Sequence, residues 1–299
     1  MTQIRPLRDV RRVVGRLTGR GAQPAAGAGA PGGGEAAEVR ARLRRTRAKL
    51  RSSRAEVAAL KTELRATRGS LRHPFPGHEP DARVYDVIDR VREEKLTYLS
   101  RDNLAALAVM TAEADRSGRP GLVIEAGTAL GGSAIVMAAA KDPARRMFVY
   151  DVFGMIPEPG EHDGADVRQR YEKIKAGESR GIGGGTYYGY RDDLYAEVTE
   201  SFTRLGVPVV EHSVELVKGL FADTIHLDEP VALAHLDGDW YESTMTCLER
   251  IAPLLVPGGR IVLDDYWAWS GCRDAVDDYT AGRAELSVER RAKVHIVRL

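Results

Sequence analysis

Cysteine and long apolar runs are what this sequence most clearly lacks. Its 299 residues include two cysteines, Cys247 and Cys272, which make neither a disulfide framework nor the spacing of a zinc site. No apolar run approaches the roughly 20 residues that span a bilayer, and the first residues lack the apolar core of a secretory signal. We therefore expect a protein of the reducing cytoplasm that is not exported.

Charge is balanced over the whole chain but unevenly distributed along it. Residues 1–72 hold 18 Lys and Arg against 5 Asp and Glu, a net charge of +13. The whole chain has 44 basic and 43 acidic residues, so the remainder holds 26 and 38, a net charge of −12. The overall value of +1 therefore hides two parts that need separate explanations.

The basic part divides into two segments. Residues 1–34 are predicted to be a disordered basic tail and an Ala/Gly/Pro-rich linker, although a short amphipathic helix lying on anionic lipid is an alternative for residues 1–20. After the linker, apolar residues recur every seven positions, at Leu43, Leu50, Val57, Leu64 and Leu71. Residues 35–75 are therefore predicted to form a basic helical arm with weak coiled-coil character. Such an arm favours a homo-oligomer, or contact with a partner or with the inner face of a membrane. Nucleic acid is disfavoured as a partner, because no aromatic residues are interleaved.

Residues 80–299 alternate between apolar strands and helical stretches, which is typical of a doubly wound, mostly parallel α/β sheet. The expected strands are 122–125, 147–150, 207–210, 231–236 and 260–263, with a closing hairpin of 285–290 and 293–299. The expected helices are 85–91, 102–114 and 133–140. Residues 157–193 form a long insertion with little regular pattern, which predicts a lid or binding loop. Its tyrosines either line an acceptor pocket or pack on the surface.

Acidic residues directly follow the last two of these parallel strands. Asp237 and Asp239 follow the fourth strand, and Asp264 and Asp265 follow the fifth. Because ligands bind at the carboxyl ends of parallel strands, we expect these carboxylates to converge there. Crowded carboxylates repel unless a cation or a proton offsets their charge, and an all-oxygen cluster suits Mg2+ or another hard divalent ion. The alternatives are that Asp239 only caps the next helix and that Asp265 faces solvent. His235, inside the fourth strand, is interpreted as a packed core residue.

A glycine-rich turn, Glu125-Ala-Gly-Thr-Ala-Leu-Gly-Gly-Ser133, follows the first predicted strand. Gly127 permits a sharp turn, and the start of the following helix offers unpaired N–H groups to a ligand. Asp151 ends the second strand, where dinucleotide folds bind ribose hydroxyls. The turn lacks the Gly-x-Gly-x-x-Gly pattern and the Lys-[Ser/Thr] of triphosphate hydrolysis, so by itself it only favours a small-molecule site.

Several blocks of residues occur together in a specific order. They are Leu96-Thr97, Glu125–Thr128, Tyr187–Tyr190, Val217–Thr224, Leu236-Asp-Gly-Asp-Trp-Tyr-Glu-Ser-Thr244, Pro257-Gly-Gly259 through Asp264-Asp-Tyr266, and Trp269–Asp277. Together they resemble the macrocin O-methyltransferase family, metal- and S-adenosylmethionine-dependent class I enzymes that methylate hydroxyls on sugars of natural products. The resemblance covers about residues 85–299 and implies a class I methyltransferase sheet of six parallel strands with an antiparallel seventh near the end.

The resemblance also implies roles for particular residues. The methyl donor would be S-adenosylmethionine, Asp239 the general base, and the ligands of a divalent ion such as Mg2+ would be Asp237, Asp264 and Asp265. The cofactor contacts that it implies are Thr97, Glu125, Gly127, Thr128, Ser133 and Asp151. The Arg-rich first 75 residues lie outside the resemblance.

The implied chemistry explains why these residue types occur. An aliphatic hydroxyl is a poor nucleophile at neutral pH, a divalent cation lowers the pKa of an oxygen that it binds, and a carboxylate can accept the released proton. The expected function is methyl transfer from S-adenosylmethionine to a hydroxyl of a sugar or glycosylated natural product. Two alternatives stay open: a metal-dependent glycosyltransferase with an Asp-x-Asp motif, and a non-catalytic scaffold in glycan assembly.

Overall fold

The computed structural model describes residues 79–299 and, before them, positions 42, 46, 49, 50, 53, 57 and 75. The chain divides into two compact units, residues 1–61 and residues 62–299. The six described positions of the first unit are helical and exposed. The predicted tail and linker, and the rest of the predicted arm, lie outside the described residues. The predicted boundaries at residues 34, 75 and 80 stay predictions.

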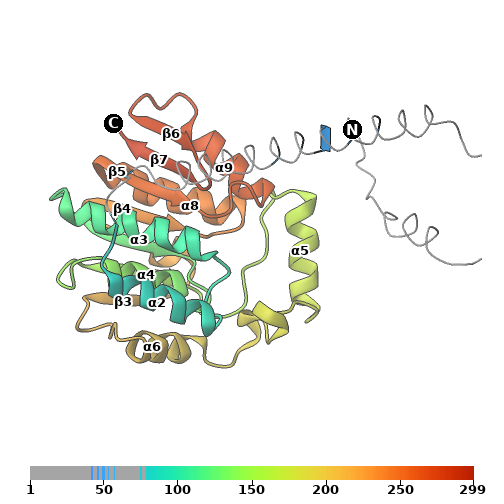
Figure 1. Cartoon of the computed structure of the whole chain (residues 1–299), viewed down its shortest axis with the longest axis horizontal. Coiled ribbons are helices and arrows are strands. Elements are labelled where there is room, and N and C mark those ends of the chain that lie inside the picture. Colours follow the sequence, from blue (N-terminus) through green and yellow to red (C-terminus); the bar gives the residue numbers. More distant parts are fainter. Residues whose placement is uncertain are drawn as a thin grey trace, which may run out of the picture. The chain divides into compact units, whose positions relative to one another are not determined.

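A seven-stranded sheet forms the centre of the second unit (Figure 1). In spatial order its strands are β3 (Val214–Lys218), β2 (Met147–Asp151), β1 (Leu122–Ala126), β4 (Val231–Leu236), β5 (Leu255–Leu263), β7 (Val294–Arg298) and β6 (Leu286–Arg290). Strands β1 to β5 run parallel, whereas β7 is antiparallel to both β5 and β6. The chain reverses its direction of progress between β1 and β4, which is the point where open α/β sheets bind ligands.

Helices cover both faces of this sheet, as a mostly parallel sheet requires. The first face packs against α2 (Ala82–Glu93), α3 (Arg101–Arg116), α4 (Gly132–Ala140) and α6 (Leu194–Arg204). The second face packs against α7 (Phe221–Thr224), α8 (Tyr241–Ile251) and α9 (Ser270–Thr280). Successive strand residues supply opposite cores, so Val123 lies in the first and Ile124 in the second. The predicted doubly wound α/β class is confirmed.

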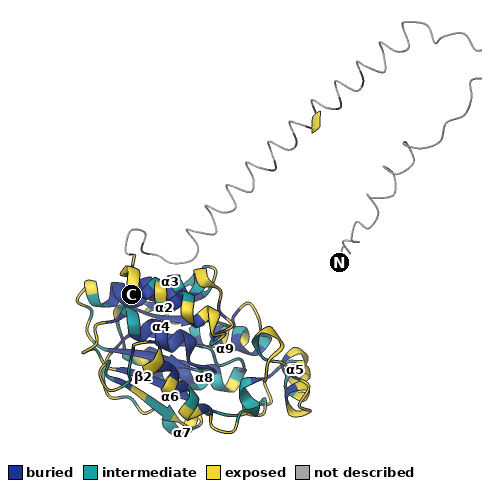
Figure 2. Cartoon of the chain, turned by 60° about the horizontal axis from the view of Figure 1, so that its bottom comes forward, coloured by how far each residue is buried: buried dark blue, intermediate teal, exposed yellow. Residues whose placement is uncertain are grey.

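Helix α4 shows why the glycine-rich turn is followed by a helix. Its sequence, Gly-Ser-Ala-Ile-Val-Met-Ala-Ala-Ala, is apolar nearly all round, and its residues are buried from Gly132 to Ala138. Such a helix needs cover on every side, and α4 has it between the sheet and helices α2 and α3 (Figure 2). Its first turn is thereby held at the carboxyl end of β1.

The strand predicted at residues 207–210 is wrong. The third strand is β3, which pairs in parallel with β2 so that Val214 lies opposite Met147. Pro208 interrupts the earlier apolar run and removes a backbone donor, and residues 209–213 form turns instead. Only Val214 of β3 is buried, because β3 is an edge strand, and its sequence therefore lacks the apolar run of a central strand.

The insertion at residues 157–193 is more regular than predicted. It contains α5 (Ala165–Lys175) and two short 3-10 turns, Ile182–Gly184 and Tyr188–Tyr190. Helix α5 stands apart from the other helices in Figure 1 and buries Val167 and Ile174 in a small cluster of its own with Trp240. Most of its residues are polar, so the apolar positions were too few to reveal the helix by periodicity.

The other predicted elements are confirmed within a few residues. The three predicted helices correspond to α2, α3 and α4, and the closing hairpin is formed by β6 and β7. The fifth strand begins earlier than predicted, because β5 also includes Pro257-Gly-Gly259. In the part of the chain that the structure describes, no helix has both the length and the apolar character to cross a bilayer.

Candidate active site

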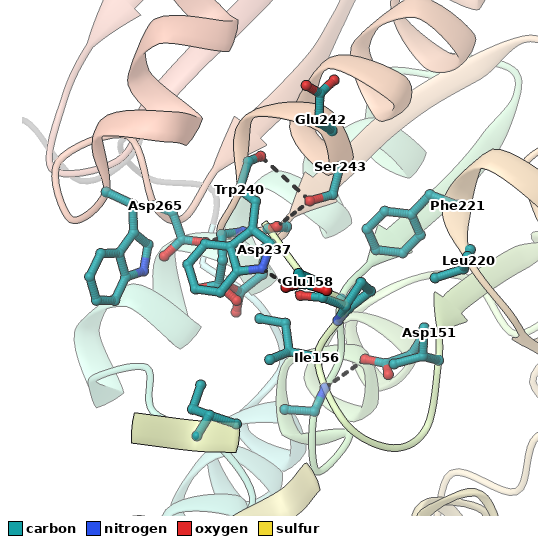
Figure 3. A pocket seen from close by; sticks show the side chains of 18 of the residues that line it. Asp151, Ile156, Glu158, Leu220, Phe221, Asp237, Trp240, Glu242, Ser243 and Asp265 are labelled. Carbon is teal, nitrogen blue, oxygen red and sulfur yellow. Dashed lines mark hydrogen bonds between the residues drawn. The ribbon is translucent and has the colours of Figure 1, made fainter. Parts of the chain in front are cut away.

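The carboxyl ends of the central strands open into a cavity of about 430 Å3. The turn after β1 lines it through Gly127 and Ala129, and Asp151 at the end of β2 lies beside them. The acidic loops after β4 and β5 also line it, and Figure 3 shows Asp237 and Asp265 together, with Asp151 apart from them across the cavity. The glycine-rich turn and the acidic loops therefore share one cavity.

Three carboxylates cluster in this cavity. Asp237, Asp239 and Asp265 each place one oxygen so that these atoms all lie within 4.8 Å of one another. The loop after β4 lies close to the loop after β5, because the Asp239 amide donates a 3.1 Å hydrogen bond to Oδ2 of Asp265. Asp239 has a φ of +56°. Three oxygen donors at this spacing are a set that fits a hard divalent cation.

Burial and mutual repulsion disfavour the ionised form of this cluster. Burial raises the pKa of Asp237 well above its usual value, and the charges of Asp265 and then Asp264 raise it further. Burial, followed by the charge of Asp265, raises the pKa of Asp239 in the same way. The pKa of Asp265 is also raised, chiefly by burial. A cation or a proton is therefore needed to offset the negative charge.

The two structural alternatives for these acids are wrong. Asp239 does not cap α8, because the backbone amide of Tyr241 at the start of that helix donates to Asp163. The N-cap residue of α8 is Trp240, whose side chain makes no cap. Asp265 does not face solvent either, because only 5% of it is exposed.

Asp264 is not a member of the cluster, although it adjoins Asp265 in the sequence. Its Oδ1 atom lies 2.6 Å from Nζ of Lys293 and 3.7 Å from Nε2 of His235. Burial acts to raise the pKa of Asp264, but His235 and then Lys293 outweigh burial and lower it. Of the four acids that follow β4 and β5, the structure therefore brings three together and pairs the fourth with two basic side chains.

His235 connects the two halves of the site from within the sheet. It lies on β4 with Glu125 of β1 beside it, and its Nδ1 atom is 3.6 Å from Oε1 of Glu125. This distance and the 3.7 Å to Asp264 are too long for hydrogen bonds but short enough for strong charge attraction. Burial acts to lower the pKa of His235, yet Asp264 and Glu125 raise it to about 9. The interpretation of His235 as a packed core residue missed these partners, since Glu125 lies on another strand and Asp264 follows another strand.

The turn after β1 depends on Gly127. Its φ is +88°, and an added Cβ would lie 1.9 Å from the carbonyl oxygen of Asp237. Only glycine therefore lets this turn approach the β4 loop. Asp151 holds the turn in shape, because its carboxylate accepts N–H bonds from Thr128 at 2.7 Å, Ala129 at 3.0 Å and Phe153 at 2.7 Å.

The structure places two of the six predicted cofactor contacts, Gly127 and Asp151, in the cavity wall. The other four are buried beside or beneath the turn and do not line the cavity: Thr97, Glu125, Thr128 and Ser133. The Ser133 hydroxyl donates to one carboxylate oxygen of Glu125. The other oxygen of Glu125 has no hydrogen-bond partner among the described residues.

Aromatic side chains make much of the remaining wall. Tyr187 and Tyr188 of the insertion line the cavity, which supports the pocket interpretation over surface packing. Sequence reasoning missed the others: Tyr98, Phe221, Trp240 and Trp269. It also missed Arg170 of α5, the one basic side chain among the described residues that line the cavity. A signal was available for the two tryptophans, because each lies within four residues of an acidic loop.

With this geometry in view, the match to known families is informative. The family model described as "Macrocin-O-methyltransferase (TylF)" matches residues 78–288, which include the glycine-rich turn and both acidic loops. The chain belongs to this family. The resemblance inferred from the sequence blocks is thereby confirmed, and the basic residues before position 78 lie outside the match to the macrocin O-methyltransferase family.

Curated relatives are similar over part of their length. The 8-demethyl-8-(2,3-dimethoxy-alpha-L-rhamnosyl)-tetracenomycin-C 4'-O-methyltransferase of Streptomyces olivaceus is 37% identical over 184 residues, covering 60% of this chain and 64% of the relative. Demethyldecarbamoylnovobiocin O-methyltransferase of Streptomyces niveus is 30% identical over 171 residues, covering 54% and 59%. The chain thus spans less than two thirds of the length of the curated relatives that it matches.

A solved structure shares the fold. The O-methyltransferase NovP superposes with a TM-score of 0.56 at 24% sequence identity, covering 80% of this chain and 98% of that one. The mostly parallel seven-stranded sheet is therefore the class I methyltransferase sheet that the resemblance implied.

Proposed function

We propose that this member of the macrocin O-methyltransferase family transfers a methyl group from S-adenosylmethionine to a sugar hydroxyl of a glycosylated natural product. The observation that supports this most is the single cavity lined by Gly127 and Asp151 on one side and by the clustered carboxylates on the other. A relative named for methylating a rhamnosyl-tetracenomycin supports a sugar-linked acceptor.

The turn after β1 is proposed to bind the methyl donor. Gly127 lets the backbone approach the ligand closely, and Asp151 is proposed to accept hydrogen bonds from the ribose hydroxyls. An ionised carboxylate has about four acceptor sites, so the three N–H bonds to Asp151 leave capacity for a hydroxyl. Glu125, Thr97, Thr128 and Ser133 are proposed to support the turn from beneath.

The clustered carboxylates are proposed to hold a divalent cation such as Mg2+, with Asp237 and Asp265 as its ligands. The fit rests on the three oxygen donors within 4.8 Å; burial, followed by the charges of the neighbouring acids, raises the pKa of Asp237 and Asp239, so a cation would favour their ionised form. Such an ion, when bound, lowers the pKa of the acceptor hydroxyl. Asp264, which the family pattern also suggests as a ligand, is proposed to support Asp265 through its pair with Lys293.

Asp239 is proposed to be the general base. Its carboxylate would accept the proton of the acceptor hydroxyl while that oxygen forms a bond to the methyl carbon of the donor. The bond between this carbon and sulfur breaks, and its electron pair stays on sulfur to give neutral S-adenosylhomocysteine. Trp240, Trp269 and Tyr187 are proposed to pack against the acceptor and to exclude water from this transfer.

The test is methyl transfer by the purified full-length protein. S-adenosylmethionine and a rhamnosylated aromatic polyketide are supplied with Mg2+, or with a chelator and no metal, and products are followed by mass spectrometry. We expect S-adenosylhomocysteine and a methylated glycoside only with Mg2+. Equal turnover after complete metal removal would exclude the role of the metal, and absence of S-adenosylmethionine binding in calorimetry would exclude the function.

The two alternatives are tested in the same series. A metal-dependent glycosyltransferase would bind a nucleotide sugar and not S-adenosylmethionine, and membership of a methyltransferase family argues against it. A scaffold would bind neither, and the three clustered carboxylates argue against it.

Self-association, membrane or partner contact through residues 1–75, and a cytoplasmic location stay predictions. A variant that lacks residues 1–75 tests the role of the arm. If its oligomeric size and its binding to anionic vesicles equal those of the full chain, the arm has neither function.

A further inference from the structure

A short segment of the insertion crosses the beginnings of α8 and α9. We call residues 160–166 the strap; they comprise the end of the loop that precedes helix α5 and the first two residues of that helix. Helices α8 and α9 are the two helices that follow the acidic loops of β4 and β5. The proposed function rests on the position of those loops but uses no side chain of the strap.

Asp163 of the strap holds the start of α8. Only 5% of Asp163 is exposed, its Oδ1 accepts the backbone N–H of Tyr241 at 2.8 Å, and its Oδ2 accepts that of Gly160 at 2.9 Å. The first N–H groups of a helix have no partner within the helix, and a negative charge there is stabilised by the helix dipole. Because the N-cap residue Trp240 offers no side-chain acceptor, Asp163 supplies it from the insertion.

Asp166 holds the start of α9 in the same way. One oxygen accepts the backbone N–H of Ser270 at 3.0 Å, and the other accepts the hydroxyl of Ser270 at 2.6 Å. The N-cap residue of α9, Trp269, also makes no side-chain cap. Two carboxylates of one strap therefore cap two helices that begin beside the acidic cluster.

Glycines let the strap lie directly on these helix starts. A Cβ added to Gly271 would lie 2.2 Å from Oδ1 of Asp163, and one added to Gly164 would lie 2.5 Å from the hydroxyl oxygen of Ser270. A Cβ added to Gly160 would lie 2.3 Å from Cγ of Glu242. A third tether lies just before the strap, where the indole N–H of Trp240 donates to the carbonyl of Pro157 at 3.0 Å. The strap thus packs closely against the starts of α8 and α9 along its length.

The acidic loops need such support because one of them is strained. Asp239 has a φ of +56°, which is costly for a residue other than glycine. It lies two residues before Tyr241, whose amide Asp163 binds, and its own amide donates to Asp265. Movement at the start of α8 would therefore shift Asp239 relative to Asp265.

We propose that Asp163 and Asp166 are positioning residues, which hold the loops of Asp239 and Asp265 in the spacing that the cation and the acceptor require. This inference rests on the proposed function, because it gives the strap a role in that same site. Neither carboxylate lines the cavity. Each acts through the helix that it caps and does not contact the reacting groups.

The principal variant is Asp163→Asn in the full-length protein. Asparagine keeps one acceptor oxygen but loses the charge and the second acceptor, so the start of α8 is held less firmly. We expect Mg2+ affinity and kcat each to fall by about 10- to 100-fold, as for other residues that orient metal ligands, with KM for S-adenosylmethionine unchanged. Hydrogen exchange at the Tyr241 amide should accelerate. Asp166→Asn, at an exposed position, should give a weaker effect and faster exchange at Ser270.

The matched control is Glu161→Gln, which removes the same charge from an exposed position of the same strap. It should leave Mg2+ affinity, kcat and exchange as in the unmodified protein. If Asp163→Asn accelerates exchange while kcat and Mg2+ affinity stay unchanged, the strap is only structural and the proposal is overturned. Unchanged exchange at both helix starts overturns it too.

Failure of the proposed function gives a different result. If the unmodified protein methylates no acceptor, calorimetry with Mg2+ alone still compares it with Asp163→Asn. Weaker Mg2+ binding by the variant supports the positioning role, and equal binding overturns it. If Asp163→Asn does not fold, as judged by circular dichroism, the same measurements on Asp166→Asn decide.

Discussion

The ammonium group of Lys293 lies 2.6 Å from the carboxylate of Asp264 and keeps that acid apart from the cluster formed by its neighbour Asp265. Lys293 belongs to the connection between β6 and β7, so the C-terminal hairpin supports the site from the edge of the sheet beside β5. Both aspartates line the cavity, but they have two different environments: Asp264 is paired with Lys293 and His235, and Asp265 clusters with Asp237 and Asp239.

Lys293→Met should destabilise the protein, because Asp264 then keeps only His235 as a cationic partner. The substitution removes the cationic partner of a largely buried carboxylate and the hydrogen bond from Nζ to the backbone carbonyl of Asp264, which together cost about 1–3 kcal/mol. Chemical denaturation at pH 7 measures this loss. Lys218→Met, at an exposed lysine on the edge strand, is the control and should change the free energy of unfolding by less than about 0.5 kcal/mol. Equal effects of the two substitutions would show that the Lys293 pair contributes nothing.

Mg2+ should stabilise the protein through the acidic cluster. The raised pKa of Asp237 means that its ionised form is disfavoured in the folded state, so the cluster lowers the free energy of unfolding as pH rises above the ordinary aspartate value. A bound cation offsets this, by about 2.7 kcal/mol at a concentration 100 times its Kd. Asp237→Asn should be more stable than the unmodified protein without Mg2+ at pH 8 and should gain less from the ion.

Calorimetric unfolding with and without Mg2+ measures both effects. Asp228→Asn, at an exposed position that does not line the cavity, is the control and should respond to Mg2+ like the unmodified protein. A melting temperature of the unmodified protein that does not respond to Mg2+ would contradict the assignment of the cluster to a metal.

His235 should make stability depend on pH. Its folded-state pKa of about 9 lies above its ordinary value of 6.5, so its pairing with Asp264 and Glu125 stabilises fully below pH 6.5 and is lost as pH rises through 9. The contribution is roughly 3 kcal/mol, since one pKa unit corresponds to about 1.4 kcal/mol. The free energy of unfolding of His235→Gln should therefore lie furthest below that of the unmodified protein near pH 6, and the difference should shrink towards pH 9.5. His226→Gln, at an exposed histidine, should show no such trend, and parallel curves for His235→Gln would refute the pairing.

Gly127→Ala should destabilise the protein more than Gly118→Ala, although both glycines have a positive φ. Gly118 also has a positive φ, of +64°, but an added Cβ there meets nothing within 4 Å, so Gly118→Ala should cost only the conformational strain of about 1–2 kcal/mol. At Gly127 the added Cβ also meets the Asp237 carbonyl, which should bring the cost to about 3–5 kcal/mol. Thermal unfolding of both variants compares them. Equal losses would mean that the turn can withdraw from the β4 loop.

Central strands could be predicted well because their environment is simple. The bounds of β4 agree with the run Val231–Leu236, which is buried on both faces and follows Pro230. The edge strand β3 could not be predicted in this way, since its solvent-facing residues break the apolar run. Helix α5 escaped prediction for a related reason, because it packs through few apolar residues on a cluster that other parts of the chain complete.

The convergence of the acids could be predicted, but their division could not. Parallel strands that end at the same sheet edge bring Asp237, Asp239 and Asp265 together. The different environment of Asp264 depends on Lys293, which lies 29 residues later, and on His235 of another strand. No local pattern encodes such pairs. The role of Asp163 in the strap could not be predicted for the same reason. In the sequence, an acid just before a polar helix cannot be distinguished from a solvated surface residue, and its partner Tyr241 lies 78 residues later.

The most direct test of this account is the turnover of Asp239→Asn at saturating S-adenosylmethionine, acceptor and Mg2+. We expect the variant to bind S-adenosylmethionine as tightly as the unmodified protein and to transfer methyl groups about 10^2- to 10^4-fold more slowly, because the acceptor proton has lost its base. Turnover equal to that of the unmodified protein would contradict it.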